Sequence, residues 1–143
     1  MEPPNERRDR IVVINDDTDF LSLMSELLTE VGEYDVEICR EGNHAYQFVK
    51  ERQPDLAILD IRMEGQEAGW AILECLTLDP TTSQIPMIVC SAAIRELQAH
   101  QELLDRYGID VLTKPFDLDA LLEKVATALD RGQRHEHGGG MQK

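Results

Sequence analysis

The sequence predicts an α/β fold in which helices cover both faces of a parallel sheet. Short apolar segments, typical of strands, alternate five times with longer segments whose apolar residues recur at helical spacing. Several of the short segments are apolar throughout, as strands are when both of their faces are buried. The repeated strand–helix order therefore predicts a doubly wound sheet of five parallel strands in three α/β/α layers.

The five predicted strands are short and most are followed by polar residues. The second shows apolar–polar alternation, which places it near an edge of the sheet. Right-handed crossovers leave few arrangements, and we expect the flavodoxin-like strand order 2-1-3-4-5. The strands are predicted at residues 11–14, 35–39, 56–60, 85–90 and 109–113.

Five helices are predicted between and after these strands. The first is capped by Asp17 or Thr18 and ends at Gly32, and the others cover 42–52, 70–78, 94–107 and about 117–131. The residues of the first helix expected to face the core are Phe20, Leu23, Met24, Leu27, Leu28 and Val31.

Length and composition indicate one domain. We expect a flexible segment at 1–9, a folded domain at 10–131 and a disordered polar tail at 132–143. The formal net charge of −14 argues against direct binding to nucleic acid or to an anionic membrane. Three widely spaced cysteines and the absence of a long apolar segment or a signal sequence indicate a cytoplasmic location.

Asp60 is the residue around which the predicted site is organised. It ends the third strand, at the edge of the sheet where open α/β folds bind ligands, and the loop Asn15–Asp17 is expected to meet it there. Ser91 and Lys114 follow the fourth and fifth strands. Carboxylates that converge repel one another unless a cation separates them, and oxygen ligands favour Mg²⁺.

These residue types predict a site for phosphoryl transfer. Asp16 and Asp60 are expected to bind Mg²⁺, while Lys114 adds a positive charge and Ser91 donates to a phosphoryl oxygen. Asp60 is then the nucleophile that receives the phosphoryl group. No glycine-rich nucleotide loop occurs, so ATP bound by this chain is not the expected donor.

Four motifs resemble the receiver domain of bacterial two-component response regulators: IVVINDDTDF, LAILDIRM, MIVCSAA and VLTKPFDLDALL. The resemblance covers about residues 9–130. It implies a phosphoprotein of phosphorelay signal transduction, with 4-aspartylphosphate as the modified residue and Mg²⁺ as the cofactor. The implied roles are Asp60 as phosphoacceptor, Asp16 and the Arg62 carbonyl as metal ligands, Ser91 as phosphoryl contact and Lys114 as site lysine, with a cis Lys114–Pro115 bond.

The resemblance also implies the partners. These are a histidine kinase or phosphotransfer protein and a downstream target protein, with the chain a monomer or weak dimer. About a dozen polar residues follow the last predicted helix, so we expect a stand-alone receiver without an output domain. It is expected to signal by phosphorylation-dependent protein–protein interaction and to catalyse only its own phosphorylation and dephosphorylation.

The chain departs from the family pattern at three places. Asn15 replaces the first residue of the acidic pair; its amide oxygen can hold a metal-bound water, but one charge is lost and weaker Mg²⁺ binding is expected. Glu64 replaces the usual proline after Asp60, and Gly69 comes one residue late. Val111 stands where the family often has Tyr or Phe, so an aromatic switch coupled to the serine is not expected on the fifth strand.

Two alternatives remain at this point. A degenerate receiver would bind partners without phosphorylation. Asn15 and Val111 favour it, whereas the intact site residues oppose it: Asp16, Asp60, Ser91 and Lys114. A Mg²⁺-dependent phosphatase of the haloacid-dehalogenase type would need an acidic residue two positions after its nucleophile. Arg62 stands there and cannot act as a general acid.

Overall fold

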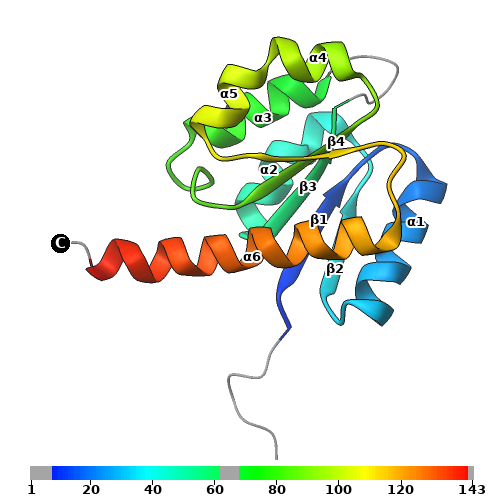
Figure 1. Ribbon diagram of the computed structural model, residues 1–143, viewed down its shortest axis with the longest axis horizontal. Helices are drawn as coiled ribbons and strands as arrows, with labels where there is room; N and C mark the ends of the chain where they lie inside the picture. The colour runs from blue at the N-terminus through cyan, green and yellow to red at the C-terminus, as the bar shows by residue number, and fades with distance from the viewer. Residues whose placement is uncertain (1–7, 62–67, 142–143) are drawn as a thin grey trace, which may run out of the picture.

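The fold is the three-layer α/β/α arrangement that the sequence predicts. A computed structural model describes residues 8–61 and 68–141. Its sheet has five parallel strands in the order β2-β1-β3-β4-β5 (Figure 1). The strands are β1 (Arg10–Ile14), β2 (Asp35–Cys39), β3 (Leu56–Asp60), β4 (Met87–Ser91) and β5 (Asp110–Thr113). The predicted bounds of β2 and β3 agree with these to the residue.

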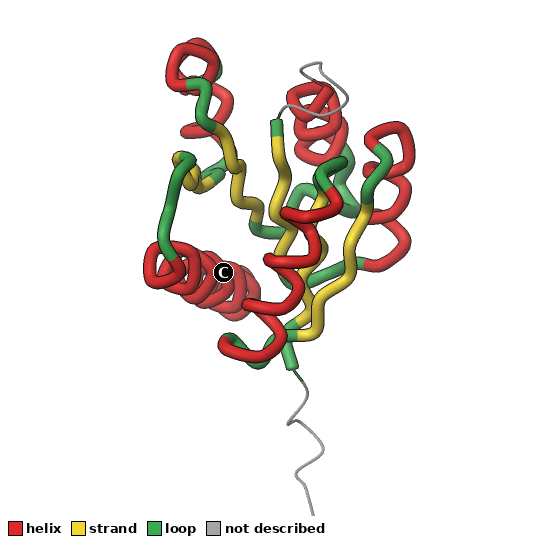
Figure 2. Tube along the Cα trace, turned by 90° about the vertical axis from the view of Figure 1, so that its right-hand side faces the viewer, coloured by secondary structure: helices red, strands yellow, loops and turns green. Residues whose placement is uncertain are grey.

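Helices cover both faces of the sheet, as the tube view makes plain (Figure 2). Residues of α1 and α6 share one buried cluster with one face of the sheet, and residues of α2, α3, α4 and α5 share the other. The helices are α1 (Thr18–Glu26), continued by the π-helical segment η1 (Leu27–Val31), α2 (Gly42–Arg52), α3 (Ala68–Leu78), α4 (Ile94–Ala99), α5 (Gln101–Arg106) and α6 (Leu118–Met141). No helix of the described segments is long and apolar enough to cross a membrane.

The central strands β1 and β3 are buried on both faces. Val12 and Ile14 of β1 pack into one cluster, whereas Ile11 and Val13 pack into the other, because successive side chains of a strand point to opposite faces. All five residues of β3 are buried as well, including Asp60. The apolar run that ends in a carboxylate is therefore the centre of the sheet.

The residues predicted to face the core from α1 are partly wrong. Leu21, Met24 and Leu28 form the buried stripe, whereas Leu23 is 53% exposed and Val31 is 52% exposed. The helix carries apolar residues on two neighbouring stripes, and periodicity alone does not say which stripe faces the sheet. The π-helical turn of η1 also changes the phase of the last residues.

The single helix predicted over 94–107 is two short helices. Residue His100, with φ −109° and ψ 18°, separates α4 from α5. The sequence has no glycine or proline there, so no ordinary helix-breaking signal predicts this break.

The last helix is longer than predicted, because α6 continues to Met141 and not only to about residue 131. Gly132 lies inside this helix against Pro86, where an added Cβ would be 2.5 Å from Cγ of that proline. The glycine thus permits close packing. Inside a helix it costs only about 1 kcal/mol relative to alanine, which does not end the helix.

The start of α1 depends on Asp17, whose side chain accepts hydrogen bonds from the backbone N–H groups of Asp19 and Phe20. Replacing this cap with Asp17→Ala should lower the free energy of unfolding by about 1 kcal/mol, because two N–H groups lose their acceptor. Asp17→Asn keeps an acceptor and should stay within a few tenths of a kcal/mol of the parent chain. Urea denaturation measures both, and an alanine variant as stable as the asparagine variant would contradict this role.

Candidate functional site

Four of the predicted site residues lie together at the carboxyl edge of the sheet. Asn15 directly follows β1, Asp60 ends β3, Ser91 ends β4 and Lys114 directly follows β5. Strand pairing fixes their proximity, since Asp60 lies opposite Cys90 in the β3–β4 ladder. The juxtaposition predicted from the strand order is therefore confirmed.

Asp60 is the centre of this group and is only 8% exposed. Its Oδ2 atom accepts a hydrogen bond of 2.9 Å from Nδ2 of Asn15 and lies 3.1 Å from Nζ of Lys114. The lysine contact is a salt bridge, and hydrogen bonds to a charged acceptor are stronger than those between neutral groups. Two donors from two other strand ends thus hold one carboxylate oxygen in place.

Asn15 is fixed as firmly as the carboxylate it contacts. It is 1% exposed, its Oδ1 atom accepts the backbone N–H of Asp17 at 2.9 Å, and its own N–H donates to the backbone oxygen of Cys39 at 3.1 Å. The amide oxygen, predicted to hold a metal-bound water, is thus already hydrogen-bonded to the chain. Asn15 removes one negative charge from the site and also adds a donor that an ionised Asp cannot supply.

Lys114 is held by the ring of Phe20 and by the backbone. Its Nζ atom lies 4.8 Å from the centre of the Phe20 ring, which meets the ring of Phe116 edge-on at 6.4 Å. The backbone N–H of Lys114 donates to the oxygen of Ser91 at 2.9 Å, and the Lys114–Pro115 bond is cis, as the family resemblance implies. These contacts direct the ammonium group toward Asp60.

Ser91 and two alanines form the open side of the site. Oγ of Ser91 accepts the backbone N–H of Ala93 at 3.0 Å, and a hydroxyl that accepts one hydrogen bond can still donate another. Asp60, Ser91, Ala92, Ala93 and Lys114 line one pocket of about 340 Å³. A carboxylate, a hydroxyl and an ammonium group therefore face a space that admits a phosphoryl group.

Gly69 brings the start of α3 close to the end of β3. Its N–H donates to the oxygen of Ile61 at 2.9 Å, and an added Cβ would lie 2.5 Å from Cα of Ile61 and 2.7 Å from the backbone oxygen of Asp60. Only glycine fits this approach. Arg62 and Glu64, which were predicted to be a metal ligand and a departure from the family, lie outside the described residues.

The donor set fits a hard divalent cation that keeps several waters. Asp60 offers one carboxylate, and Asp16, which is exposed and directly follows Asn15, is the second carboxylate expected from the sequence. Among the residues that the structure describes, no three His, Cys, Asp or Glu side chains gather as a metal cluster. Two carboxylates suffice for Mg²⁺, which is usually bound by one or two carboxylates together with water and phosphate oxygens.

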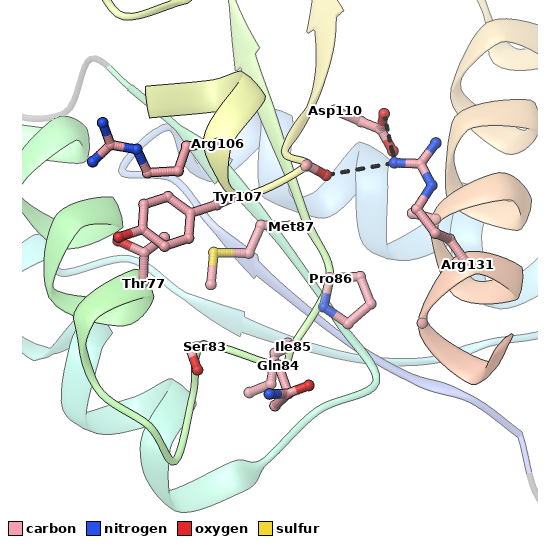
Figure 3. A pocket seen from close by; sticks show the side chains of 13 residues that line it. Thr77, Ser83, Gln84, Ile85, Pro86, Met87, Arg106, Tyr107, Asp110 and Arg131 are labelled. Carbon is pink, nitrogen blue, oxygen red and sulfur yellow. Dashed lines mark hydrogen bonds and ion pairs between the residues drawn. The ribbon is translucent and has the colours of Figure 1, made fainter. Parts of the chain in front are cut away.

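A second hollow lies at the opposite, amino edge of β4 and β5 (Figure 3). Met87 and Tyr107 lie on its walls, and Nη1 of Arg131 bonds both carboxylate oxygens of Asp110, at 3.2 and 3.3 Å. This arginine is therefore neutralised by its neighbour. Parallel sheets bind their ligands at the carboxyl edge, so the Asp60 site is the better candidate.

The similarity to known proteins agrees with this geometry. The family profile described as "Response regulator receiver domain" matches residues 11–126, which is most of the chain. The chain belongs to the response regulator receiver domain family. Receiver domains act in phosphorelay signalling, where their partners are histidine kinases or phosphotransfer proteins.

Curated relatives of the chain are longer than it is. A region of 125 residues, 87% of the chain, is 32% identical to the DNA-binding dual master transcriptional regulator RpaA of Synechocystis. The chain spans 51% of the length of RpaA and 26% to 50% of other curated relatives.

Solved structures share the fold. A sensor protein from Polaromonas sp. JS666 is 26% identical with a TM-score of 0.75, and the match covers 87% of this chain and 98% of that one. The receiver domain of sensor histidine kinase PA1611 from Pseudomonas aeruginosa, described with a magnesium ion in its active site cleft, has a TM-score of 0.72. That match covers 86% of this chain and 98% of the other, and its 20% identity shows the fold alone.

Cys90 lies beside the site but is chemically silent. Burial raises the pKa of its thiol to about 12, with Asp60 adding to the rise and Lys114 opposing it. At pH 8 this thiol is protonated and enclosed, and burial likewise raises the pKa of Cys39. The third cysteine, Cys75, is exposed on α3.

Thiol labelling at pH 8 should therefore modify one of the three cysteines rapidly in the folded chain. We expect Ellman's reagent to release one equivalent within minutes, and Cys75→Ser to abolish that fast phase. Unfolding in guanidinium should expose all three thiols. A Cys90 that reacts as fast as Cys75 would contradict the burial described here.

Proposed function

We propose that the chain accepts a phosphoryl group on Asp60 from a phosphohistidine of a histidine kinase or phosphotransfer protein. The observation that carries this proposal is the position of Asp60, at the end of β3, held by Asn15 and Lys114 and lining an open pocket. An Asp60 oxygen attacks phosphorus, the P–N bond breaks as the P–O bond forms, and the imidazole leaves with the electron pair.

The neighbouring side chains have separate roles in this proposal. The ammonium group of Lys114 offsets the negative charge that the phosphoryl group brings, and the hydroxyl of Ser91 donates to one of its oxygens. Ala92 and Ala93 keep the entrance free of bulky side chains. These roles follow from the contacts around the pocket and need no movement of the sheet.

Mg²⁺ is the proposed cofactor. Asp16 and Asp60 would hold it, and the Arg62 carbonyl remains a ligand proposed from the family resemblance. When bound, the ion neutralises phosphoryl oxygens and favours an in-line arrangement of attacking and leaving groups. The oxygen-only donor set and the magnesium ion described for the PA1611 receiver support this part of the proposal.

We also propose that output is a change in protein binding, because phosphorylation shifts an equilibrium between conformations that a target protein distinguishes. Apart from its own phosphorylation and dephosphorylation, no catalysis is proposed. The net charge of −14 favours a protein target over nucleic acid for this domain. A cytoplasmic location is proposed as well. The curated relatives are longer regulators, of which the chain spans about half or less.

The degenerate receiver remains the second candidate. The observation that favours it is the Asn15–Asp60 hydrogen bond, which together with the Lys114 ammonium group satisfies Oδ2 of the carboxylate without a metal ion. In that case the site would serve as a structural link between strand ends.

Phosphorylation of the chain separates the two candidates. Incubation with acetyl phosphate and Mg²⁺ should add one phosphoryl group in the intact mass, because Asp60 is held in an open pocket. Asp60→Asn should abolish the adduct, whereas the matched control Asp19→Asn, an exposed aspartate in α1, should leave it unchanged. If neither acetyl phosphate nor phosphoramidate gives an adduct, the degenerate receiver is favoured.

Asn15 should weaken Mg²⁺ binding, because the site lacks one carboxylate. Restoring this carboxylate with Asn15→Asp should tighten Mg²⁺ binding by about tenfold or more, equivalent to about 1.4 kcal/mol. Isothermal titration calorimetry measures the affinity. Asn43→Asp adds the same charge at an exposed position of α2 and serves as the control, and equal affinities in all three chains would refute the expectation.

A further inference from the structure

Trp70, at the start of α3, is stacked on His100, the residue that separates α4 from α5. The ring centroids lie 3.7 Å apart and the ring planes differ by only 13°. Trp70 is 6% exposed and His100 is half-buried. The stack thus joins α3 to the point where the neighbouring helical segment changes direction (Figure 1).

The Trp70 end of this stack leads directly to the candidate site. Gly69, the preceding residue, contacts the backbone of Asp60 and Ile61 so closely that an added Cβ would lie 2.5 to 2.7 Å from it. Because the two backbones touch, a shift of the Asp60 backbone must displace Gly69. Trp70 moves with Gly69, since one peptide unit joins the two residues.

The His100 end of the stack lies at the joint between two short helices. Nδ1 of His100 lies 3.0 Å from the backbone oxygen of Glu96, so the ring is anchored to α4 while it stacks on α3. The other end of α4 also leads to the site, because the N–H of Ala93 donates to Oγ of Ser91. Both ends of α4 are therefore tied to residues around Asp60.

The indole N–H of Trp70 is an unusual feature of this stack. It is buried, and within the described part of the chain it has no hydrogen-bond acceptor. Buried tryptophans usually find one, and an unmet donor disfavours the conformation that buries it. A displaced ring whose N–H gains an acceptor would recover this cost.

We infer that the Trp70–His100 stack transmits a change at Asp60 to the α4–α5 joint, in place of the aromatic residue that Val111 does not supply. Trp70 and His100 are positioning residues in this account. The movement would displace the exposed apolar residues at the outer ends of the two helices, Ile94 and Tyr107. Exposed apolar side chains are typical binding sites for partner proteins. A movement at the α4–α5 joint would therefore change the surface that a partner contacts.

The inference rests on the proposed function only for the nature of the change at Asp60. Its test records backbone amide shifts of residues 94–106 in ¹⁵N–¹H spectra of the full chain, before and after treatment with acetyl phosphate and Mg²⁺, while intact mass reports the phosphoryl content. His100→Ala removes the stack and His100→Phe keeps a flat ring. His44→Ala, at an exposed histidine of α2, is the matched control.

We expect the parent chain, His44→Ala and His100→Phe to show shift changes across 94–106. In His100→Ala the mean change should fall to about half or less at unchanged phosphoryl content. A full response in His100→Ala, or an equal loss in His100→Phe, would overturn the inference, because the flat ring would then be irrelevant.

A second perturbation keeps the test independent of phosphoryl uptake. Asp60→Asn alters the contacts with Lys114 and Asn15, and it should shift the amide signals of residues 94–106 in the parent chain. In a chain that also carries His100→Ala, the shifts caused by Asp60→Asn should fall to about half or less. If the parent chain takes up no phosphoryl group, the proposed function fails while this comparison still decides the inference. Equal α4–α5 shifts with and without the stack would overturn it.

Discussion

The hydrogen bonds that Asn15 and Lys114 donate to Oδ2 of Asp60 join three strand ends that lie far apart in the sequence. The carboxylate is nearly buried, and a buried charge without compensating partners is strongly unfavourable. The ammonium group supplies the opposite charge, and the asparagine supplies a fixed neutral donor. The positions of Asn15, Asp60 and Lys114 therefore depend on one another. Together they fix the shape of the pocket beside Ser91.

The sheet topology makes that meeting possible. Because β1 and β3 are neighbours in the order β2-β1-β3-β4-β5, the loops that follow them leave the same edge of the sheet beside each other. The two strands are buried on both faces, so their ends have little freedom to separate. The cation–π contact of Lys114 with Phe20 then ties the end of β5 to α1, on the far side of Asp60.

Much of the fold and of the site can be predicted from the sequence, since continuous apolar runs mark the central strands and single polar residues mark their ends. The hydrogen bond from Asn15 to Asp60 could not be predicted from the sequence. The orientation of the Asn15 amide depends on its neighbours, here the backbone N–H of Asp17. The break at His100 was missed since a ring stack, rather than glycine or proline, accompanies it. Likewise, the sequence alone does not show that Gly132 packs against Pro86 inside α6.

The central claim is that Asp60, held by these two donors, is the residue that carries the phosphoryl group. Its most direct test treats the chain with acetyl phosphate and Mg²⁺, reduces the acyl phosphate with borohydride, and locates the resulting homoserine by peptide sequencing. The account predicts homoserine at position 60 and at no other aspartate. Homoserine at Asp16 or Asp17 instead, or no reduction product from a chain shown to be phosphorylated, would contradict it.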